Sequence, residues 1–173
     1  MSTRPAYCIF STDWGYFGFL AANDRLNRTC LPLEEGRNVE DQLLGGIRAT
    51  YDRTLFSGLQ REVKAYFSGE IGDFDVDRKL ALPLNSEFVR SVYIALQSVG
   101  FGNTITYAGL ALRSGSPRAY RAVGRAMALN PLPLLVPCHR VIRADGALGG
   151  FSAIGGIRLK QRLLDHERAI SSG

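Results

Sequence analysis

The hydrophobic pattern divides the chain into a strand-rich beginning and a helical remainder. Short runs rich in aromatic and branched residues predict strands over residues 6–11, 15–22 and 26–33, separated by turns. Apolar residues at helical spacing then predict helices over residues 39–55 and 59–67. The pattern indicates an α/β N-terminal domain with a small sheet, and we assign it to residues 1–83.

The second half contains residues that typically begin or end helices. Ser86 and Thr104 can each cap a helix, and Pro117 suits the first turn of another. Two short helices joined by the Gly-containing turn 114–116 fit a helix-turn-helix. We therefore predict a mainly α C-terminal domain that contains a helix-turn-helix over residues 84–173.

Composition is that of an ordinary globular protein. The 173 residues are 46% hydrophobic and 21% charged. No apolar run approaches the roughly 20 residues of a membrane span, and Met1–Pro5 has no apolar signal core. We therefore expect a cytoplasmic protein without membrane contact. Three cysteines without tight spacing do not indicate a disulfide framework.

The charge is unevenly distributed between the two halves. Residues 1–83 hold 10 Lys and Arg against 12 Asp and Glu, whereas residues 84–173 hold 11 against 4. An excess of positive charge favours a polyanion as partner, so the C-terminal half is the candidate nucleic-acid-binding half. Charge alone is equally compatible with a solvated basic surface.

One amphipathic segment, residues 118–129, concentrates this charge. On a helical wheel Arg118, Arg121 and Arg125 share one side, opposite an apolar side. Gly124 is small enough to let a backbone approach closely. The arrangement suits phosphate contacts and an arginine inserted into a duplex, although a solvated arginine face is the alternative.

Cys138 is the candidate nucleophile. An apolar run leads into Pro137-Cys138-His139-Arg140, and an ordinary cysteine needs a base or positive charges to become a thiolate at neutral pH. His139, Arg140 and Arg143 are close in sequence. On an extended chain neighbouring side chains point to opposite faces, so we expect His139 to act through water.

The last predicted helix supplies a third group. Over residues 156–168, Glu167 falls on the same arc as Leu163 and Leu164, and a carboxylate facing inward needs a partner. His139 is the candidate partner, with Glu167 fixing its tautomer. Lys160 shares this arc and could lower the pKa of the thiol. A frayed helix end with a solvated Glu167 is the alternative.

These residues belong to a specific pattern. Its segments are Thr106-Tyr107, Arg121–Gly124, Asn130-Pro131, Pro137–Val141, Gly149–Ser152, Lys160–Leu164 and Glu167. The pattern resembles the O6-alkylguanine-DNA alkyltransferases, also called methylated-DNA–protein-cysteine methyltransferases. The resemblance is strong over about residues 84–168, and over 1–83 it is limited to the strand-rich start and residues 65–69.

The resemblance implies a role for each matching residue at the reacting centre. Cys138 would be the alkyl acceptor, activated through a water by His139 and Glu167. Tyr107 would donate a proton to the departing guanine. Asn130 would hold the turn before the active-site strand.

The same resemblance implies the substrate and DNA contacts. Ser152 would contact the guanine oxygen, and the other substrate-binding positions would be Asn130, Val141, Phe151 and Lys160. Arg121 would fill the gap left by the flipped base in the minor groove, and the remaining DNA contacts would be Arg118, Arg125 and Gly124.

The implied activity is direct-reversal DNA repair. A monomer would bind double-stranded DNA carrying O6-alkylguanine and transfer the alkyl group to Cys138 once, as a suicidal methyltransferase, without metal or cofactor. Phe151 stands where a tyrosine is frequent, and residues 152–156 form a longer loop than in many members. Two alternatives are a lesion-binding protein that transfers nothing and a Cys-His hydrolase. The presence of Cys138 argues against the first, because such lesion-binding relatives lack the cysteine.

Overall fold

The computed structural model describes residues 4–72, 74 and 86–172. The chain forms two compact units, Met1–Ala81 and Leu82–Gly173. The boundary that the sequence predicts, between residues 83 and 84, lies outside the described residues. No helix in the described ranges has the length and apolar character needed to cross a bilayer.

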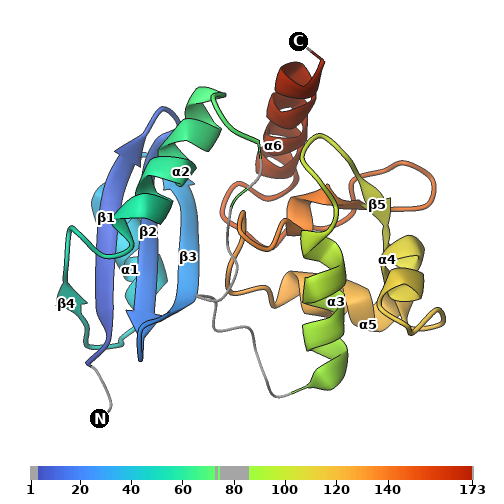
Figure 1. Ribbon diagram of the computed structural model, residues 1–173, viewed down its shortest axis with the longest axis horizontal. Helices are drawn as coiled ribbons and strands as arrows, with labels where there is room; N and C mark the ends of the chain where they lie inside the picture. Colours follow the sequence, from blue (N-terminus) through green and yellow to red (C-terminus); the bar gives the residue numbers. More distant parts are fainter. Residues whose placement is uncertain (1–3, 73, 75–85, 173) are drawn as a thin grey trace. The chain divides into compact units, whose positions relative to one another are not determined.

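The first unit is built on a four-stranded sheet (Figure 1). Its strands are β1 (Ala6–Thr12), β2 (Gly15–Ala22), β3 (Arg25–Leu33) and β4 (Thr50–Tyr51), in the order β3-β2-β1-β4. The first three are antiparallel neighbours, and β4 pairs parallel with β1. Asn23 and Asp24 both have positive φ, the conformation that a two-residue hairpin turn requires. The strands predicted over residues 6–33 are therefore confirmed.

Helices α1 (Gly36–Leu44) and α2 (Ser57–Ser68) cover opposite faces of this sheet (Figure 1). Side chains alternate between the faces because successive strand residues point to opposite sides. Leu20 packs with Val39 and Leu43 under α1. Phe17 contacts Phe67 of α2, with ring centroids 6.1 Å apart. Each face of the sheet thus has its own apolar layer.

The helix predicted over residues 39–55 is wrong in its second half. Helix α1 ends at Leu44, because Gly45 and Gly46 take positive φ values of 49° and 89°. The apolar side chains that extended the helical pattern, Ile47 and Tyr51, are 40% and 53% exposed. Tyr51 belongs to β4 instead.

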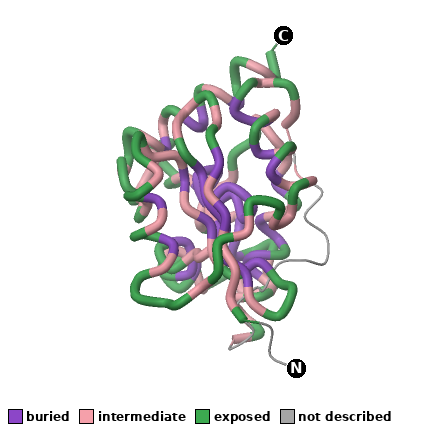
Figure 2. The backbone as a smooth tube through the Cα atoms, turned by 90° about the vertical axis from the view of Figure 1, so that its left-hand side faces the viewer, coloured by how far each residue is buried: buried purple, intermediate pink, exposed green. Residues whose placement is uncertain are grey.

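The second unit packs helices around a two-stranded parallel sheet. Its elements are α3 (Glu87–Gln97), β5 (Ile105–Thr106), α4 (Tyr107–Arg113), α5 (Tyr120–Ala128), β6 (Val141–Ile142) and α6 (Gly156–Ser171). Tyr93 of α3 donates a hydrogen bond of 2.9 Å to the Ala126 carbonyl of α5. Buried residues alternate with exposed ones along the chain (purple and green in Figure 2), and in α3 and α5 the buried ones recur at helical spacing. The predicted α/β and helical fold classes are confirmed.

Helix α3 of this unit begins where the sequence predicted, whereas α4 and α5 begin later than predicted. Ser86 caps α3 by accepting from the Val89 amide, as predicted. Thr106 rather than Thr104 caps α4, because residues 105 and 106 first pair with β6. The helix predicted to open at Pro117 begins only at Tyr120, after a turn in which the Ala119 amide donates to the Ser116 carbonyl. Helices α4 and α5 pack together as expected of a helix-turn-helix.

Gly18 allows α1 to approach the sheet. A Cβ atom there would overlap the Leu43 Cδ1 atom and lie 2.7 Å from the Val39 Cγ1 atom. We expect Gly18→Ala to lower the free energy of unfolding by about 1–3 kcal/mol through overpacking. Gly58 of α2 has open space around it, so Gly58→Ala serves as the control and should be stabilising by about 0.5 kcal/mol. Urea unfolding of both variants is the measurement, and equal midpoints would contradict this account.

Candidate active site

The segment before Cys138 is fixed by the side chain of Asn130. Its Nδ2 donates to the Val136 carbonyl at 2.8 Å, and its Oδ1 accepts from the Leu132 amide at 3.0 Å. Both hydrogen bonds are local, so they hold the loop that delivers Cys138 in one conformation.

Cys138 itself lies in a 3-10 turn, residues Cys138–Arg140, that leads directly into β6. The extended chain that the sequence suggested at this point is therefore wrong. A tight turn places its successive side chains around an axis instead of on two opposite faces. Both Cys138 and His139 are buried, at 5% and 1% exposure.

Glu167 of α6 is the centre of a buried polar cluster. Its Oε1 lies 2.7 Å from the His139 Nε2 atom, and its Oε2 accepts from the Arg140 Nε at 3.0 Å and from the Gly102 amide at 3.1 Å. The Glu167 side chain is 1% exposed. The expected pairing of Glu167 with His139 is present, and the frayed-end alternative is excluded.

The charge state of Glu167 determines the tautomer of His139. Burial opposes ionisation of Glu167, but His139 and Arg140 outweigh it and lower its pKa to about 2. An ionised carboxylate only accepts hydrogen bonds, so His139 carries its proton on Nε2. Burial lowers the pKa of His139, which keeps the ring neutral. Its Nδ1 is buried and has no hydrogen-bond partner among the described residues.

The thiol of Cys138 is protonated in this environment. Burial raises its pKa, whereas a hydrogen bond from Asn130 and the charge of Lys160 oppose the rise. The Lys160 ammonium donates to the Val141 carbonyl at 2.6 Å and to the Gly150 carbonyl at 3.5 Å. The sequence expectation that Lys160 favours the thiolate holds in direction, but burial outweighs it. The thiol therefore needs a base when it reacts.

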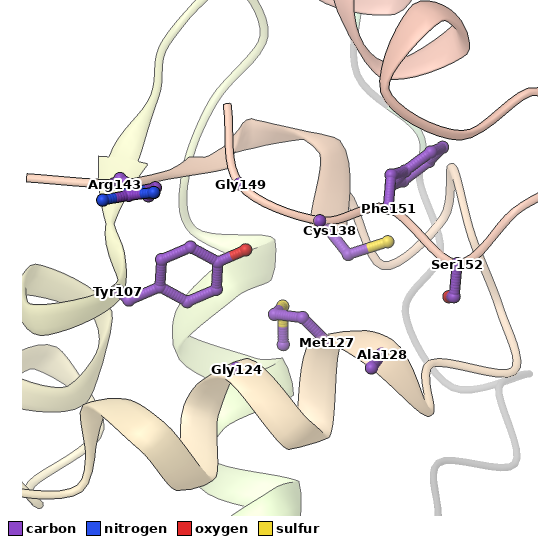
Figure 3. A pocket seen from close by; sticks show the side chains of 10 residues that line it. Tyr107, Gly124, Met127, Ala128, Cys138, Arg143, Gly149, Phe151 and Ser152 are labelled. Atoms are coloured by element: carbon purple, nitrogen blue, oxygen red, sulfur yellow. The ribbon is translucent and has the colours of Figure 1, made fainter. Parts of the chain in front are cut away.

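A pocket of about 560 Å³ opens over the sulfur of Cys138 (Figure 3). It is lined by Tyr107, Gly124, Met127, Ala128, Cys138, Arg143, Gly149, Gly150, Phe151 and Ser152. The volume is typical of a small-molecule pocket. In Figure 3 the sulfur points toward Phe151 and Ser152, and Tyr107 lies on the other side of Cys138. Cys138 thus borders a pocket large enough for a small molecule.

Tyr107 stands at the start of α4 and forms one wall of the pocket. Its pKa is raised by burial and by the neighbouring Cys138, so the hydroxyl stays protonated at neutral pH. Gly149 permits this wall, because a Cβ atom at Gly149 would lie 3.0 Å from the Tyr107 hydroxyl oxygen. A phenol held in this way can donate a proton.

The structure brings together only part of the set named from the sequence. Cys138, Tyr107, Gly124, Phe151 and Ser152 line the pocket, whereas the other eight do not. Those eight are Asn130, His139, Val141, Lys160 and Glu167, together with Arg118, Arg121 and Arg125.

The α5 arginines lie on the surface. Arg121 and Arg125 are exposed on the helix, and Arg121 lies 5.8 Å from the Tyr120 ring centroid. Arg118 is exposed but precedes the first residue of α5. Gly124 lines the pocket, and a Cβ atom added there would lie 3.9 Å from the Tyr107 Cε1 atom. Helix α5 thus presents cations outward beside the pocket wall.

The role of Arg140 was missed by sequence reasoning, which treated it as a cation near the thiol. It binds Glu167 instead and also donates to the Val99 carbonyl. The sequence did offer a signal for this role, because Glu167 was predicted to face inward and would need basic partners such as His139 and Arg140. Met127 and Ala128 of the pocket wall were also missed as pocket residues. Within the described ranges, no three His, Cys, Asp or Glu side chains gather in a metal-binding arrangement.

Fold and site define a class of protein: one with a helix-turn-helix and a buried cysteine that lines a small-molecule-sized pocket. Residues 87–169 match the family model described as 6-O-methylguanine DNA methyltransferase, DNA binding domain. The methylated-DNA–protein-cysteine methyltransferase of Mycolicibacterium paratuberculosis is 45% identical over 119 residues, 69% of each chain. That of Methanosarcina barkeri is 43% identical over 116 residues, 67% of this chain and 70% of the relative.

Solved structures agree over nearly the whole chain. Mycobacterium tuberculosis OGT in complex with DNA matches with a TM-score of 0.79 and 34% identity, covering 95% of this chain and 94% of that one. The O6-methylguanine-DNA methyltransferase of Pyrococcus kodakaraensis matches with a TM-score of 0.72 and 28% identity, covering 94% and 98%. The chain belongs to the methylated-DNA–protein-cysteine methyltransferase family.

The buried Glu167 gives stability a defined pH dependence. Its pKa of about 2 lies below the ordinary value of 4.5, so its contribution is complete above pH 4.5 and is lost as the pH falls toward 2. We expect Glu167→Gln to be less stable than wild type at pH 7, with the difference shrinking as the pH falls from 4.5 toward 2. Urea midpoints measure it. Asp165→Asn, an exposed change on the same helix, is the control. A difference that does not change with pH would contradict this assignment.

Proposed function

We propose that this protein repairs O6-alkylguanine in DNA by transferring the alkyl group to the sulfur of Cys138. The observation that carries the proposal is that Cys138 lines a pocket of about 560 Å³ whose wall includes α5. In the reaction a C–S bond forms and the C–O6 bond of guanine breaks. The resulting thioether has no easy leaving route, so each molecule reacts once.

Proton transfers complete the reaction. His139 carries its proton on Nε2, so Nδ1 is the base that takes the thiol proton, relayed by a water molecule. Glu167 stabilises the imidazolium that results. Tyr107, which lines the pocket and is protonated at neutral pH, donates a proton to the departing guanine. The negative charge on sulfur exists only during transfer, which suits a thiol whose resting pKa is raised.

The pocket would accommodate the base itself. Phe151 packs against the base or its alkyl group, and Ser152 contacts the guanine oxygen. Asn130, Val141 and Lys160 act from behind by fixing the loop and the pocket wall. Lesions other than those at the guanine O6 atom are not part of the proposal.

Double-stranded DNA would bind along α5, with the lesion flipped out of the stack. Arg121 fills the gap, Arg118 and Arg125 contact phosphates, and Gly124 lets the backbone approach. Extruding a base costs a few kcal/mol, and an inserted arginine offsets part of this cost. The family model that names this region a DNA-binding domain supports the proposal.

We further propose that the protein is a monomer located in the cytoplasm. One chain supplies every group named above, and a thiol kept for a single reaction needs a reducing compartment. The two alternatives differ in what happens to Cys138. A lesion-binding protein leaves it unmodified, and a Cys-His hydrolase regenerates it after each turnover.

Mass spectrometry after mixing with a duplex that contains one O6-methylguanine distinguishes these cases. We expect a gain of one methyl group on the Cys138 peptide and no turnover beyond one equivalent. Cys138→Ala is the control and should bind the duplex without gaining mass. Tight binding with unmodified Cys138 in the wild type would refute transfer, and turnover of an ester or amide would indicate a hydrolase.

Arg121→Ala separates extrusion from chemistry. We expect the rate with duplex O6-methylguanine to fall by about tenfold or more, because a lost insertion of this kind corresponds to 1.4 kcal/mol or more. The rate with free O6-benzylguanine, which needs no extrusion, should be unchanged. Arg158→Ala, an exposed arginine on α6, is the control. Equal losses with both substrates would exclude the insertion role.

A further inference from the structure

Arg143 has a place in the pocket that the proposed function does not use. Among the described residues lining the pocket it is the sole charged one. Its side chain is 61% exposed, so it lies at the mouth. In Figure 3 Arg143 lies on the same side of the pocket as Tyr107, whereas the sulfur of Cys138 lies beside Phe151 and Ser152. The guanidinium therefore belongs to the solvent-exposed part of the pocket lining.

A short turn holds Arg143 in this position. Its amide donates to the Ala147 carbonyl at 2.8 Å, and its carbonyl accepts from the Gly146 amide at 3.0 Å. Asp145 closes the turn by accepting from the Ala147 amide through Oδ1 at 3.1 Å. Arg143 therefore begins from an ordered backbone, which reduces the entropy lost when its side chain binds a ligand.

The present partner of Arg143 is easily exchanged. The Arg143 Nη2 atom lies 3.0 Å from the Asp145 Oδ2 atom, and the two side chains are 61% and 56% exposed. Exposed ion pairs of this kind contribute little, because water screens them and both side chains lose freedom. A bidentate anionic acceptor at the mouth can therefore replace Asp145 at small cost.

The substrate brings such an acceptor. A nucleotide base that enters the pocket leaves its sugar and two flanking phosphates at the mouth, where Arg143 is. We propose that Arg143 binds a backbone phosphate of the extruded nucleotide, exchanging Asp145 for the phosphate as the base enters. The inference rests on the proposed function and adds to it a DNA contact outside α5. Arg143 would thus hold the nucleotide in its extruded state.

The test compares Arg143→Ala with Arg168→Ala. Arg168 is a matched control, because it is also exposed and ion-paired, with Asp165 at 3.5 Å on α6. We expect Arg143→Ala to slow the reaction with duplex O6-methylguanine by about three- to tenfold. It should lower the salt slope of duplex binding by about 1. The rate with free O6-methylguanine base, which has no phosphate, should stay within twofold of wild type. Arg168→Ala should change none of these.

Two further variants separate charge from local structure. Arg143→Lys keeps the charge, so it should retain the salt slope but lose part of the duplex rate. Asp145→Asn keeps the Oδ1 acceptor of the turn and removes the competing charge. It should raise duplex affinity about twofold when Arg143 is present and not in the Arg143→Ala background.

If Arg143 only shapes the pocket, Arg143→Ala should lose reaction rate equally with duplex DNA and with free base. If Arg143 only pairs with Asp145, Arg143→Ala should behave as wild type. Either result overturns the inference, as does an equal gain from Asp145→Asn in both backgrounds. Failure of the proposed function is distinguishable, since wild type would then transfer no methyl group. The salt slope of duplex binding would still report the Arg143 contact.

Discussion

The candidate active site depends on one buried carboxylate. Glu167 accepts from His139, Arg140 and the Gly102 amide, and so joins α6 to the 3-10 turn and to the loop after α3. Removing one partner of such a cluster leaves a charge uncompensated in the interior, which is far costlier than losing an exposed ion pair. The positive charge of Arg140 balances the negative charge of Glu167. His139 can therefore stay neutral and remain a base.

The pocket lies on one side of Cys138, and the buried polar cluster around Glu167 lies on the other. The pocket side offers Tyr107, Phe151 and Ser152 to a ligand, whereas the buried side offers His139 and the charges behind it. This division explains why a thiol with a raised pKa suits the proposed reaction. Its proton leaves toward the interior while the new bond forms toward the pocket, so neither process obstructs the other.

Sequence reasoning succeeded where a physical rule acts locally. Alternating side chains and the Asn23-Asp24 turn fix the strands, and the inward arc of α6 required a partner for Glu167. It failed where a local stop signal was overlooked and where distant contacts decide. Gly45 ends α1 although the apolar spacing continues, and β6 pairs with the residues that would otherwise have begun α4. Arg140 and Glu167 are 27 positions apart, and periodicity gives no distance between them.

The raised pKa of Cys138 also has a meaning for the protein between encounters with damage. Peroxides and free electrophiles attack thiolates. The reactivity of a cysteine toward them increases with its exposure and its degree of ionisation. A cysteine that is 5% exposed and whose thiol is kept in its neutral form resists both. A molecule that can act only once is thereby protected from accidental consumption, and its single equivalent is preserved until a lesion arrives.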